Sequence, residues 1–234
     1  MSISVLKNRK VLITAGPTRE AIDPVRYISN HSSGKMGYAI AEAFLKQGAK
    51  VVLVSGPVNI QIQHPNLKLI PVTTAFEMYM ACNFHFSETD IAVFAAAVAD
   101  YKPEIVAEQK IKKAGDELLI KLVKNPDIAF EFGKVKSDNQ LSIGFALETN
   151  DELMNAESKL RCKNFDMVVL NSMNDAYATF EYDTNKITLI QRDLTPREFP
   201  VKQKSEVAND LLNAINKIII KNGLVLGEKT CTGN

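Results

Sequence analysis

Residues 29–37 read Ser-Asn-His-Ser-Ser-Gly-Lys-Met-Gly and lead into a helical pattern. The free N–H groups of a helix N-terminus, with glycines that allow close approach, favour phosphate binding. The stretch is not a P-loop, because Ser29 stands where that motif has glycine and Met36 where it has a hydroxyl residue. A plain alternative stays open, in which a capped helix uses glycine only for packing.

A second stretch that could bind a ligand is Ala95-Ala96-Ala97, which ends an apolar run and is followed by Asp100. Small side chains at a strand end leave backbone groups exposed, and these can bind a flat base. Asp100 has the carboxylate to accept from ribose hydroxyls or to hold a metal ion. An equally open interpretation is that the alanines only allow tight packing and that Asp100 only forms a turn.

Lysines form two further groups. Residues 110–113 read Lys-Ile-Lys-Lys, and Lys159 and Lys163 are four positions apart, so they project from one side of a predicted helix. Such mobile positive charges suit a phosphate or polyphosphate. Both groups are also compatible with an ordinary solvated surface, and Glu157 near the second pair supports that alternative.

The elements that must position these residues alternate between short apolar runs and helical patterns. The pattern indicates a doubly wound, mostly parallel α/β sheet, Rossmann-like, with antiparallel hairpin additions, in one domain over residues 1–225. Residues 226–234 are expected to be a disordered tail. We predict strands at 10–15, 50–55, 90–97, 117–123, 141–146 and 167–170, helices at 33–48, 74–86, 126–136, 152–164 and 205–221, and a hairpin at 179–192.

Local signals set some boundaries. Ser32 or Ser33 is expected to cap the helix at 33–48, and Gly48 to end it. In a doubly wound sheet ligands bind beyond the carboxyl ends of the strands. The site is therefore expected after residues 15, 55, 97, 146 and 170.

Composition excludes several classes of function. The 234 residues are 46% hydrophobic and 24% charged with a net charge of +1, which is typical of a globular protein without a global field for nucleic acid or anionic lipid. The three cysteines are widely spaced, as expected of free thiols in a reducing compartment. No secretory signal or apolar run of membrane-spanning length is present, so we predict a cytoplasmic protein without nucleic-acid or membrane partners.

The sequence lacks several known catalytic motifs. The three histidines lack metal-ligand spacing, and neither a nucleophile elbow nor a cysteine in a reactive context is found. The turn after the first strand carries only Gly16 instead of the three spaced glycines of a dinucleotide fingerprint. What remains is a nucleotide site with lysines and amide side chains, which can stabilise charge on phosphoryl and acyl transition states.

A family resemblance sharpens this interpretation. It rests on ordered motifs: residues 13–20 (Ile-Thr-Ala-Gly-Pro-Thr-Arg-Glu), 23–26 (Asp-Pro-Val-Arg), 29–37, 95–100, 110–113 and 124–128 (Lys-Asn-Pro-Asp-Ile). Over residues 8–220 the chain resembles phosphopantothenoylcysteine synthetase, the second activity of the bifunctional bacterial coenzyme A biosynthesis flavoproteins. The resemblance implies that CTP activates the carboxylate of 4′-phosphopantothenate as an acyl-cytidylate with release of pyrophosphate. The amine of L-cysteine then displaces CMP. Magnesium on the triphosphate is implied as well.

The resemblance also implies roles for individual residues. Asn30 matches the residue that turns over the acyl-cytidylate, with its amide donating to the developing oxyanion, and Lys110 matches a catalytic lysine that also binds nucleotide. The matching nucleotide-binding positions are Ala95, Ala96, Ala97, Asp100, Pro126, Asp127, Ile128, Ala129, Phe145, Lys159 and Lys163. The substrate and phosphate positions are expected to be Gly16, Thr18, Arg19, Ser32, Ser33, Gly34, Lys35 and Met36. No residue is assigned to a metal.

Partners follow from the same resemblance. The family is dimeric, and the hairpin at 179–192 is our candidate interface. The flavin-dependent decarboxylase half of the bifunctional proteins is not in this sequence, so a free-standing synthetase and an excised domain both stay open, and a separate phosphopantothenoylcysteine decarboxylase is an expected partner. Eukaryotic relatives use ATP, whereas the bacterial-style motifs at 110–113 and 125–128 favour CTP.

Two other functions remain as alternatives. A nicotinamide-dependent oxidoreductase would share the fold, although the glycine fingerprint is missing. A nucleotide-binding module without catalysis would bind CTP with no turnover.

Overall fold

The computed structural model describes residues 4–113, 115–173, 182–221 and 223. Its strands are β1 (Lys10–Ala15), β2 (Arg19–Ala21), β3 (Tyr27–Ser29), β4 (Lys50–Ser55), β5 (Leu67–Pro71), β6 (Ile91–Phe94), β7 (Tyr101–Pro103), β8 (Leu122–Lys124), β9 (Leu141–Glu148), β10 (Met167–Ser172), β11 (Thr184–Asn185), β12 (Thr188–Gln191), β13 (Pro196–Glu198) and β14 (Lys202–Gln203). Its helices are α1 (Lys35–Lys46), α2 (Ala75–Phe86), α3 (Ile128–Val135), α4 (Glu152–Cys162) and α5 (Lys204–Lys221).

An eight-stranded sheet forms the centre, with the order β13-β12-β10-β9-β6-β1-β4-β5. The strands from β5 to β10 are parallel, whereas β12 and β13 add antiparallel to one edge. The chain runs outward from β1 in one direction through β4 and β5, and in the other through β6, β9 and β10. This confirms the predicted doubly wound sheet, and it puts the topological switch point between β1 and β6.

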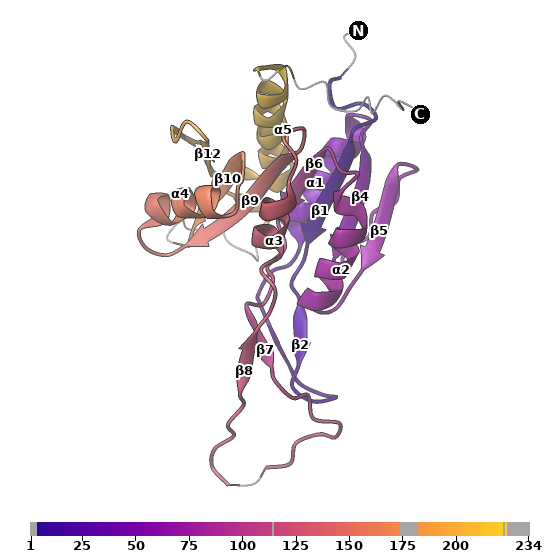
Figure 1. Ribbon diagram of the computed structural model, residues 1–234, viewed down its shortest axis with the longest axis vertical. Coiled ribbons are helices and arrows are strands. Elements are labelled where there is room, and N and C mark those ends of the chain that lie inside the picture. The colour runs from indigo at the N-terminus through magenta and orange to yellow at the C-terminus, as the bar shows by residue number, and fades with distance from the viewer. Residues whose placement is uncertain (1–3, 114, 174–181, 222, 224–234) are drawn as a thin grey trace.

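Alternating side chains along the strands build two cores, one on each face of the sheet. Val11 and Ile13 of β1 join α1 and α5 on one face, and Leu12 joins α2, α3 and α4 on the other. Each large aliphatic side chain that is fully buried contributes roughly 1.5–3 kcal/mol. The helices cover both faces of the sheet, as Figure 1 shows, and none within the described ranges is long and apolar enough to cross a membrane.

An arm projects from this body beyond the carboxyl ends of β1 and β6 (Figure 1). It consists of the antiparallel pairs β2–β3 and β7–β8, with β2 against β7, and of residues 104–121, which connect β7 to β8. The sequence patterns did not predict the arm, since its strands have only three residues each and do not face the core.

Several predicted boundaries need correction. The strand predicted at 90–97 ends at Phe94, and of the strand predicted at 117–123 only residues 122 and 123 are extended, within β8. The hairpin predicted at 179–192 is also wrong where the structure describes it. Thr184–Asn185 pairs with Lys202–Gln203, and Thr188–Gln191 pairs with β10 and β13. Residues 179–181 and the predicted tail at 226–234 lie outside the described residues.

Candidate functional site

A cavity of about 420 Å³ opens at the carboxyl ends of β1, β6 and β9, beside the switch point of the sheet. This is where doubly wound sheets bind ligands. The cavity brings together most of the predicted site residues: Asn30, Ser32, Ser33, Gly34, Lys35, Met36, Ala95, Ala96, Ala97, Asp100, Pro126, Asp127, Ile128, Ala129, Phe145, Lys159 and Lys163 all line it.

The floor of the cavity is the chain that leaves β6. All three alanine N–H groups donate within the protein: Ala95 to the Thr14 carbonyl at 3.2 Å, Ala96 to Thr14 Oγ1 at 3.3 Å, and Ala97 to the Gly16 carbonyl at 2.9 Å. These bonds hold the segment against the end of β1. A base lying on the alanines would therefore meet their carbonyl groups and methyl groups instead of free N–H groups.

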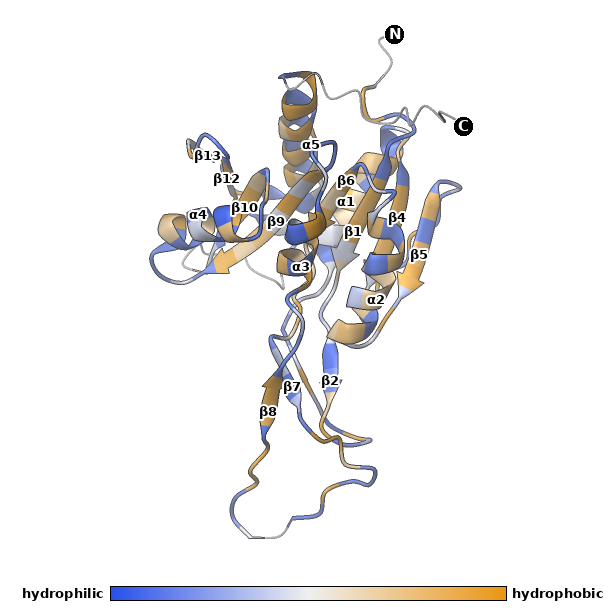
Figure 2. Ribbon diagram, in the orientation of Figure 1, coloured by the Kyte–Doolittle hydropathy of each residue, from blue (hydrophilic) through white to orange (hydrophobic). Residues whose placement is uncertain are grey.

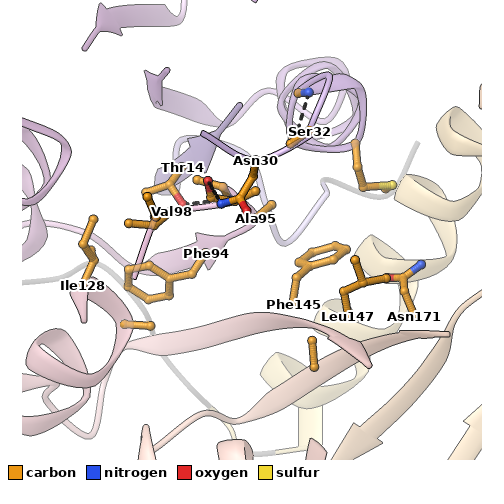
Figure 3. A pocket seen from close by; sticks show the side chains of 18 of the residues that line it. Thr14, Asn30, Ser32, Phe94, Ala95, Val98, Ile128, Phe145, Leu147 and Asn171 are labelled. Atoms are coloured by element: carbon orange, nitrogen blue, oxygen red, sulfur yellow. Dashed lines mark hydrogen bonds between the residues drawn. The ribbon is translucent and has the colours of Figure 1, made fainter. Parts of the chain in front are cut away.

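Asn30 stands over this floor at the point where the arm joins the body. Its Nδ2 donates to the Ala97 carbonyl at 3.0 Å, the bond drawn in Figure 3. The preceding Ser29 Oγ donates to the Thr18 carbonyl at 2.8 Å. The second N–H of an amide nitrogen remains for another acceptor, so Asn30 is fixed in place and still has a donor to offer.

The N-terminus of α1 forms one side. The expected serine cap is not observed, because the N-cap residue is Gly34 in a left-handed conformation (φ +76°), and Ser32 Oγ accepts from the Gly34 N–H at 3.3 Å. A glycine has no side chain to cap the helix, and the N-terminus of α1 lines the cavity, where the helix dipole favours an anion. Gly37 lets α1 approach β1 closely, since a Cβ there would lie 2.6 Å from Ala15 Cβ.

The opposite side carries the two lysines of the α4 region. Lys159 Nζ lies 2.6 Å from Glu148 Oε1, and Lys163 Nζ lies 2.9 Å from Asp127 Oδ2. Asp127 also caps α3 by accepting from the Phe130 N–H at 3.1 Å. The predicted pair thus projects to one side, and each lysine has a carboxylate beside it that a polyphosphate would have to displace or share.

Among the described residues, four lysines line the cavity, and at least three of them lie beside a carboxylate. Its described lining includes four lysines (Lys35, Lys159, Lys163 and Lys204) and two aspartates (Asp100 and Asp127). Lys35 Nζ lies 2.6 Å from Asp183 Oδ1, and that ion pair lowers the pKa of the Asp183 carboxyl. An anionic ligand would therefore compete with the carboxylate partners of Lys35, Lys159 and Lys163.

Lys204 was missed by the sequence patterns. It begins α5, is buried, and donates through Nζ to the Tyr182 carbonyl. Burial, and secondarily the charge of Lys35, lowers the pKa of Lys204, while Asp183 acts in the opposite direction.

Other lining residues were missed as well. Thr14 is buried in β1, Asn125 donates through Nδ2 to the Ala99 carbonyl at 2.9 Å, and Asn171 follows the apolar part of β10. A signal existed for Asn171, a polar residue directly after a predicted strand end. Thr14 gave none, since it sits inside an apolar run.

Four predicted residues do not line the cavity. Thr18 is fully buried, and its Oγ1 accepts from the Ala99 N–H at 3.0 Å. Gly16 has a φ of +75° and lies against Gly56 and Val58. Arg19 stacks on the Tyr27 ring of the arm at 4.7 Å, and Lys110 lies exposed in the segment between β7 and β8.

No group of three or more His, Cys, Asp or Glu side chains among the described residues is arranged to hold a metal ion. The carboxylates nearest the cavity are Asp100 and Asp127. They fit a cation that arrives together with a triphosphate better than a resident metal centre.

Comparison with known proteins now identifies the family. Residues 6–219 match the DNA/pantothenate metabolism flavoprotein C-terminal domain. The chain belongs to this family. It is 49% identical over 210 residues to the coenzyme A biosynthesis bifunctional protein CoaBC of Haemophilus influenzae, covering 90% of this chain and 52% of that protein.

Two further relatives agree. A protein named cysteine/cysteine sulfinic acid decarboxylase, from an unknown prokaryotic organism, is 49% identical over 214 residues, covering 92% of this chain and 60% of that protein. The crystal structure of the C-terminal domain of a CoaBC protein superimposes with a TM-score of 0.79 at 39% identity, covering 93% of this chain and 99% of that one. The chain spans little more than half the length of the curated relatives it matches, and it corresponds to the C-terminal part of CoaBC.

Proposed function

We propose that this domain is a phosphopantothenate–cysteine ligase of coenzyme A biosynthesis. In the proposed reaction CTP activates 4′-phosphopantothenate, and L-cysteine then captures the acyl-cytidylate. The observation that carries the proposal is one cavity lined by Asn30, the N-terminus of α1 and the two lysines Lys159 and Lys163. That set provides an amide for an acyl oxyanion and two separate places for phosphate groups.

The floor supports binding of a base with an amino group. Because the N–H groups of Ala95, Ala96 and Ala97 are used within the chain, the polar groups left on this floor are carbonyl oxygens, of which that of Ala97 already accepts from Asn30 Nδ2 and the Thr18 N–H. Cytosine and adenine present an exocyclic amino donor to such acceptors, whereas uracil presents an oxygen at that position. The choice of CTP over ATP rests on the family resemblance of the motifs at 110–113 and 125–128.

The chemistry needs charge stabilisation in both steps. First, a carboxylate oxygen of phosphopantothenate attacks the α-phosphorus, the bond to the β-phosphate oxygen breaks, and pyrophosphate leaves. Lys159 and Lys163 would offset the charge of the phosphates. Then the cysteine amine attacks the acyl carbon, and Asn30 donates to the oxyanion until CMP leaves and the amine loses its proton. Magnesium bound to the triphosphate would neutralise further charge, next to Asp100 or Asp127.

The test measures pyrophosphate release with CTP, ATP, GTP and UTP, each with and without cysteine. We expect CTP to work best and CMP to appear only when phosphopantothenate and cysteine are both present. Asn30→Ala is expected to release pyrophosphate once and to accumulate acyl-cytidylate, with turnover about 100-fold slower or more. Pyrophosphate release that does not require phosphopantothenate would refute the ligase, and wild-type turnover of Asn30→Ala would refute the role of Asn30.

We also propose a homodimer, with the arm as its interface instead of the region 179–192. Large apolar side chains are exposed along the arm: Val25, Tyr27, Tyr101, Ile105, Leu119 and Leu122. Figure 2 shows hydrophobic stretches of the ribbon on β8 and on parts of the segment that connects β7 to β8. Contiguous exposed apolar surface is typical of association sites. Light scattering should give twice the chain mass, and Ile105→Glu with Leu119→Glu should halve it; a wild-type mass of 25.9 kDa would refute the dimer.

A separate phosphopantothenoylcysteine decarboxylase is the partner that would consume the product. We place both in the cytoplasm, where Cys82 and Cys162 would remain thiols.

A further inference from the structure

The Lys-Ile-Lys-Lys segment is tied to the turn of the β2–β3 hairpin. Ala107 N–H donates to the Ile22 carbonyl at 3.0 Å, and Ile111 N–H donates to Asp23 Oδ2 at 3.1 Å. Arg26 Nη2 donates to the Ile111 carbonyl at 3.0 Å. Both backbone groups of the residue that follows Lys110 are therefore held by the hairpin.

Asp23 is the centre of this attachment. Although it lies on a projecting arm, the residue is only 2% exposed. Its Oδ1 accepts from the Val25 N–H at 2.9 Å and the Arg26 N–H at 2.8 Å, and its Oδ2 accepts from Arg26 Nε at 3.0 Å as well as from Ile111. The Arg26 guanidinium, helped by these backbone N–H groups, holds the pKa of the Asp23 carboxyl well below its usual range against the opposing effect of burial.

The same hairpin carries Asn30. Its second strand, β3, ends at Ser29, and Asn30 follows with its bond to the Ala97 carbonyl. Arg26 and Asn30 are four positions apart, which is roughly 13 Å of extended chain. The hairpin thus fixes Asn30 at its base and the lysine segment at its turn.

We propose that Asp23 is a positioning residue for Lys110, acting through the backbone of Ile111. This inference rests on the proposed function and on the nucleotide-binding role that the family resemblance implies for Lys110. The attachment divides residues 104–121 into two shorter spans. Fewer residues then have to be ordered when Lys110 meets a phosphate, and this preorganisation raises the rate of activation.

Limited trypsin digestion tests the attachment without any substrate, because Lys110, Lys112 and Lys113 are exposed cleavage sites. Two variants break the same hydrogen bond from opposite sides: Asp23→Asn weakens the acceptor, and Ile111→Pro removes the N–H donor. The matched control is Glu104→Gln, which removes one charge from the same segment, in the exposed ion pair with Lys121, without touching Ile111. We expect cleavage after Lys112 and Lys113 to be at least about tenfold faster in both variants and unchanged in the control. Cleavage after Lys110 is compared only in Asp23→Asn, because trypsin does not cleave the Lys–Pro bond that Ile111→Pro creates. Unchanged cleavage in Asp23→Asn and Ile111→Pro would overturn the attachment.

Pyrophosphate release tests the positioning role. Asp23→Asn is expected to slow it roughly tenfold, the effect of ordering about one more residue, and to have no further effect in a Lys110→Gln background. Cysteine capture of preformed acyl-cytidylate should proceed at the wild-type rate. Independent, multiplying effects of Asp23→Asn and Lys110→Gln would show that Asp23 acts on the fold and not through Lys110. A wild-type protein that releases no pyrophosphate would reject the proposed function and this role with it, whereas the digestion result would still decide the attachment.

Discussion

Replacing Gly37 by alanine should damage the site far more than the fold. An added Cβ at position 37 would lie 2.6 Å from Ala15 Cβ, 3.2 Å from Ala15 Cα and 3.4 Å from the Thr14 carbonyl oxygen. Carbon atoms pack best at about 3.5–4.0 Å, so α1 must move away from β1 by roughly 1 Å at this end.

The two consequences differ in size. Overpacking of this kind costs about 1–3 kcal/mol, and the better helix propensity of alanine returns up to about 1 kcal/mol, so stability should fall by roughly 0–2 kcal/mol. The same shift displaces the N-terminus of α1, which lines the cavity. A misplacement of about 1 Å in groups that hold a reacting substrate lowers the rate roughly 100-fold.

Gly48→Ala is the matched control at the other end of α1. Gly48 has a φ of +81°, and its nearest neighbour for a new Cβ is Lys7 Cγ at 3.4 Å. The left-handed conformation should cost about 1–2 kcal/mol without moving the N-terminus of the helix. We therefore expect urea unfolding to show similar losses for the two variants, while kcat/KM for phosphopantothenate falls only in Gly37→Ala. A folded Gly37→Ala protein with wild-type kcat/KM would refute the assignment of the α1 N-terminus to the substrate.

Three further predictions concern charges and thiols. Glu148→Gln frees Lys159 from its carboxylate partner at 2.6 Å and should lower KM for the nucleotide roughly threefold to tenfold in initial-rate measurements; a raised KM would mean that Glu148 orients Lys159 for binding. Lys136→Met should destabilise the protein by about 1–3 kcal/mol in urea unfolding, and wild-type stability would contradict this. The Lys136 side chain is 5% exposed and bonds Asp166 at 2.7 Å and the Asn164 carbonyl at 2.8 Å, while Arg192, 3.0 Å from Asp166, still pairs with that carboxylate in the variant. Burial lowers the pKa of Lys136 from its ordinary value of 10.5, so just below pH 10.5 the unfolded chain binds more protons than the folded protein. In that range the free energy of unfolding of the wild type should therefore rise with pH, and the variant should lack this rise. Burial raises the pKa of the Cys82 thiol to about 12, so iodoacetamide should label the exposed Cys162 in native protein and Cys82 only after unfolding, as read by peptide mass spectrometry; native labelling of Cys82 would contradict the packing of α2.

Periodicity predicted the body of the fold because burial enforces it there. The strand at 10–15 has its predicted bounds, and the helix predicted at 74–86 begins at Ala75 behind a Thr74–Glu77 capping box. β5 was missed, since it is an edge strand with no buried residue, and its sequence Leu-Lys-Leu-Ile-Pro shows little contrast between its faces. The false hairpin at 179–192 has a similar origin: β-rich runs near a turn look paired, but Thr188–Gln191 finds a better partner in the buried strand β10.

The site was predictable to the extent that the sheet positions it. Residues at and just beyond strand ends come together at the switch point whatever their side chains, which is why the stretch from Ala95 to Asp100 lines the cavity. Asn30, Phe145 and the α4 lysines also line it, but the sequence assigned them to one shared site only through the family resemblance. Lys110 depends on a different determinant. Its place is set by polar bonds from one buried carboxylate in an arm of four short strands without apolar periodicity. No sequence pattern reveals which backbone N–H group a side chain such as Asp23 will accept from. The sequence of a charged motif between two short strands can therefore indicate a family role. Its position relative to the cavity, however, can only be read from the hydrogen bonds that anchor it in the structure.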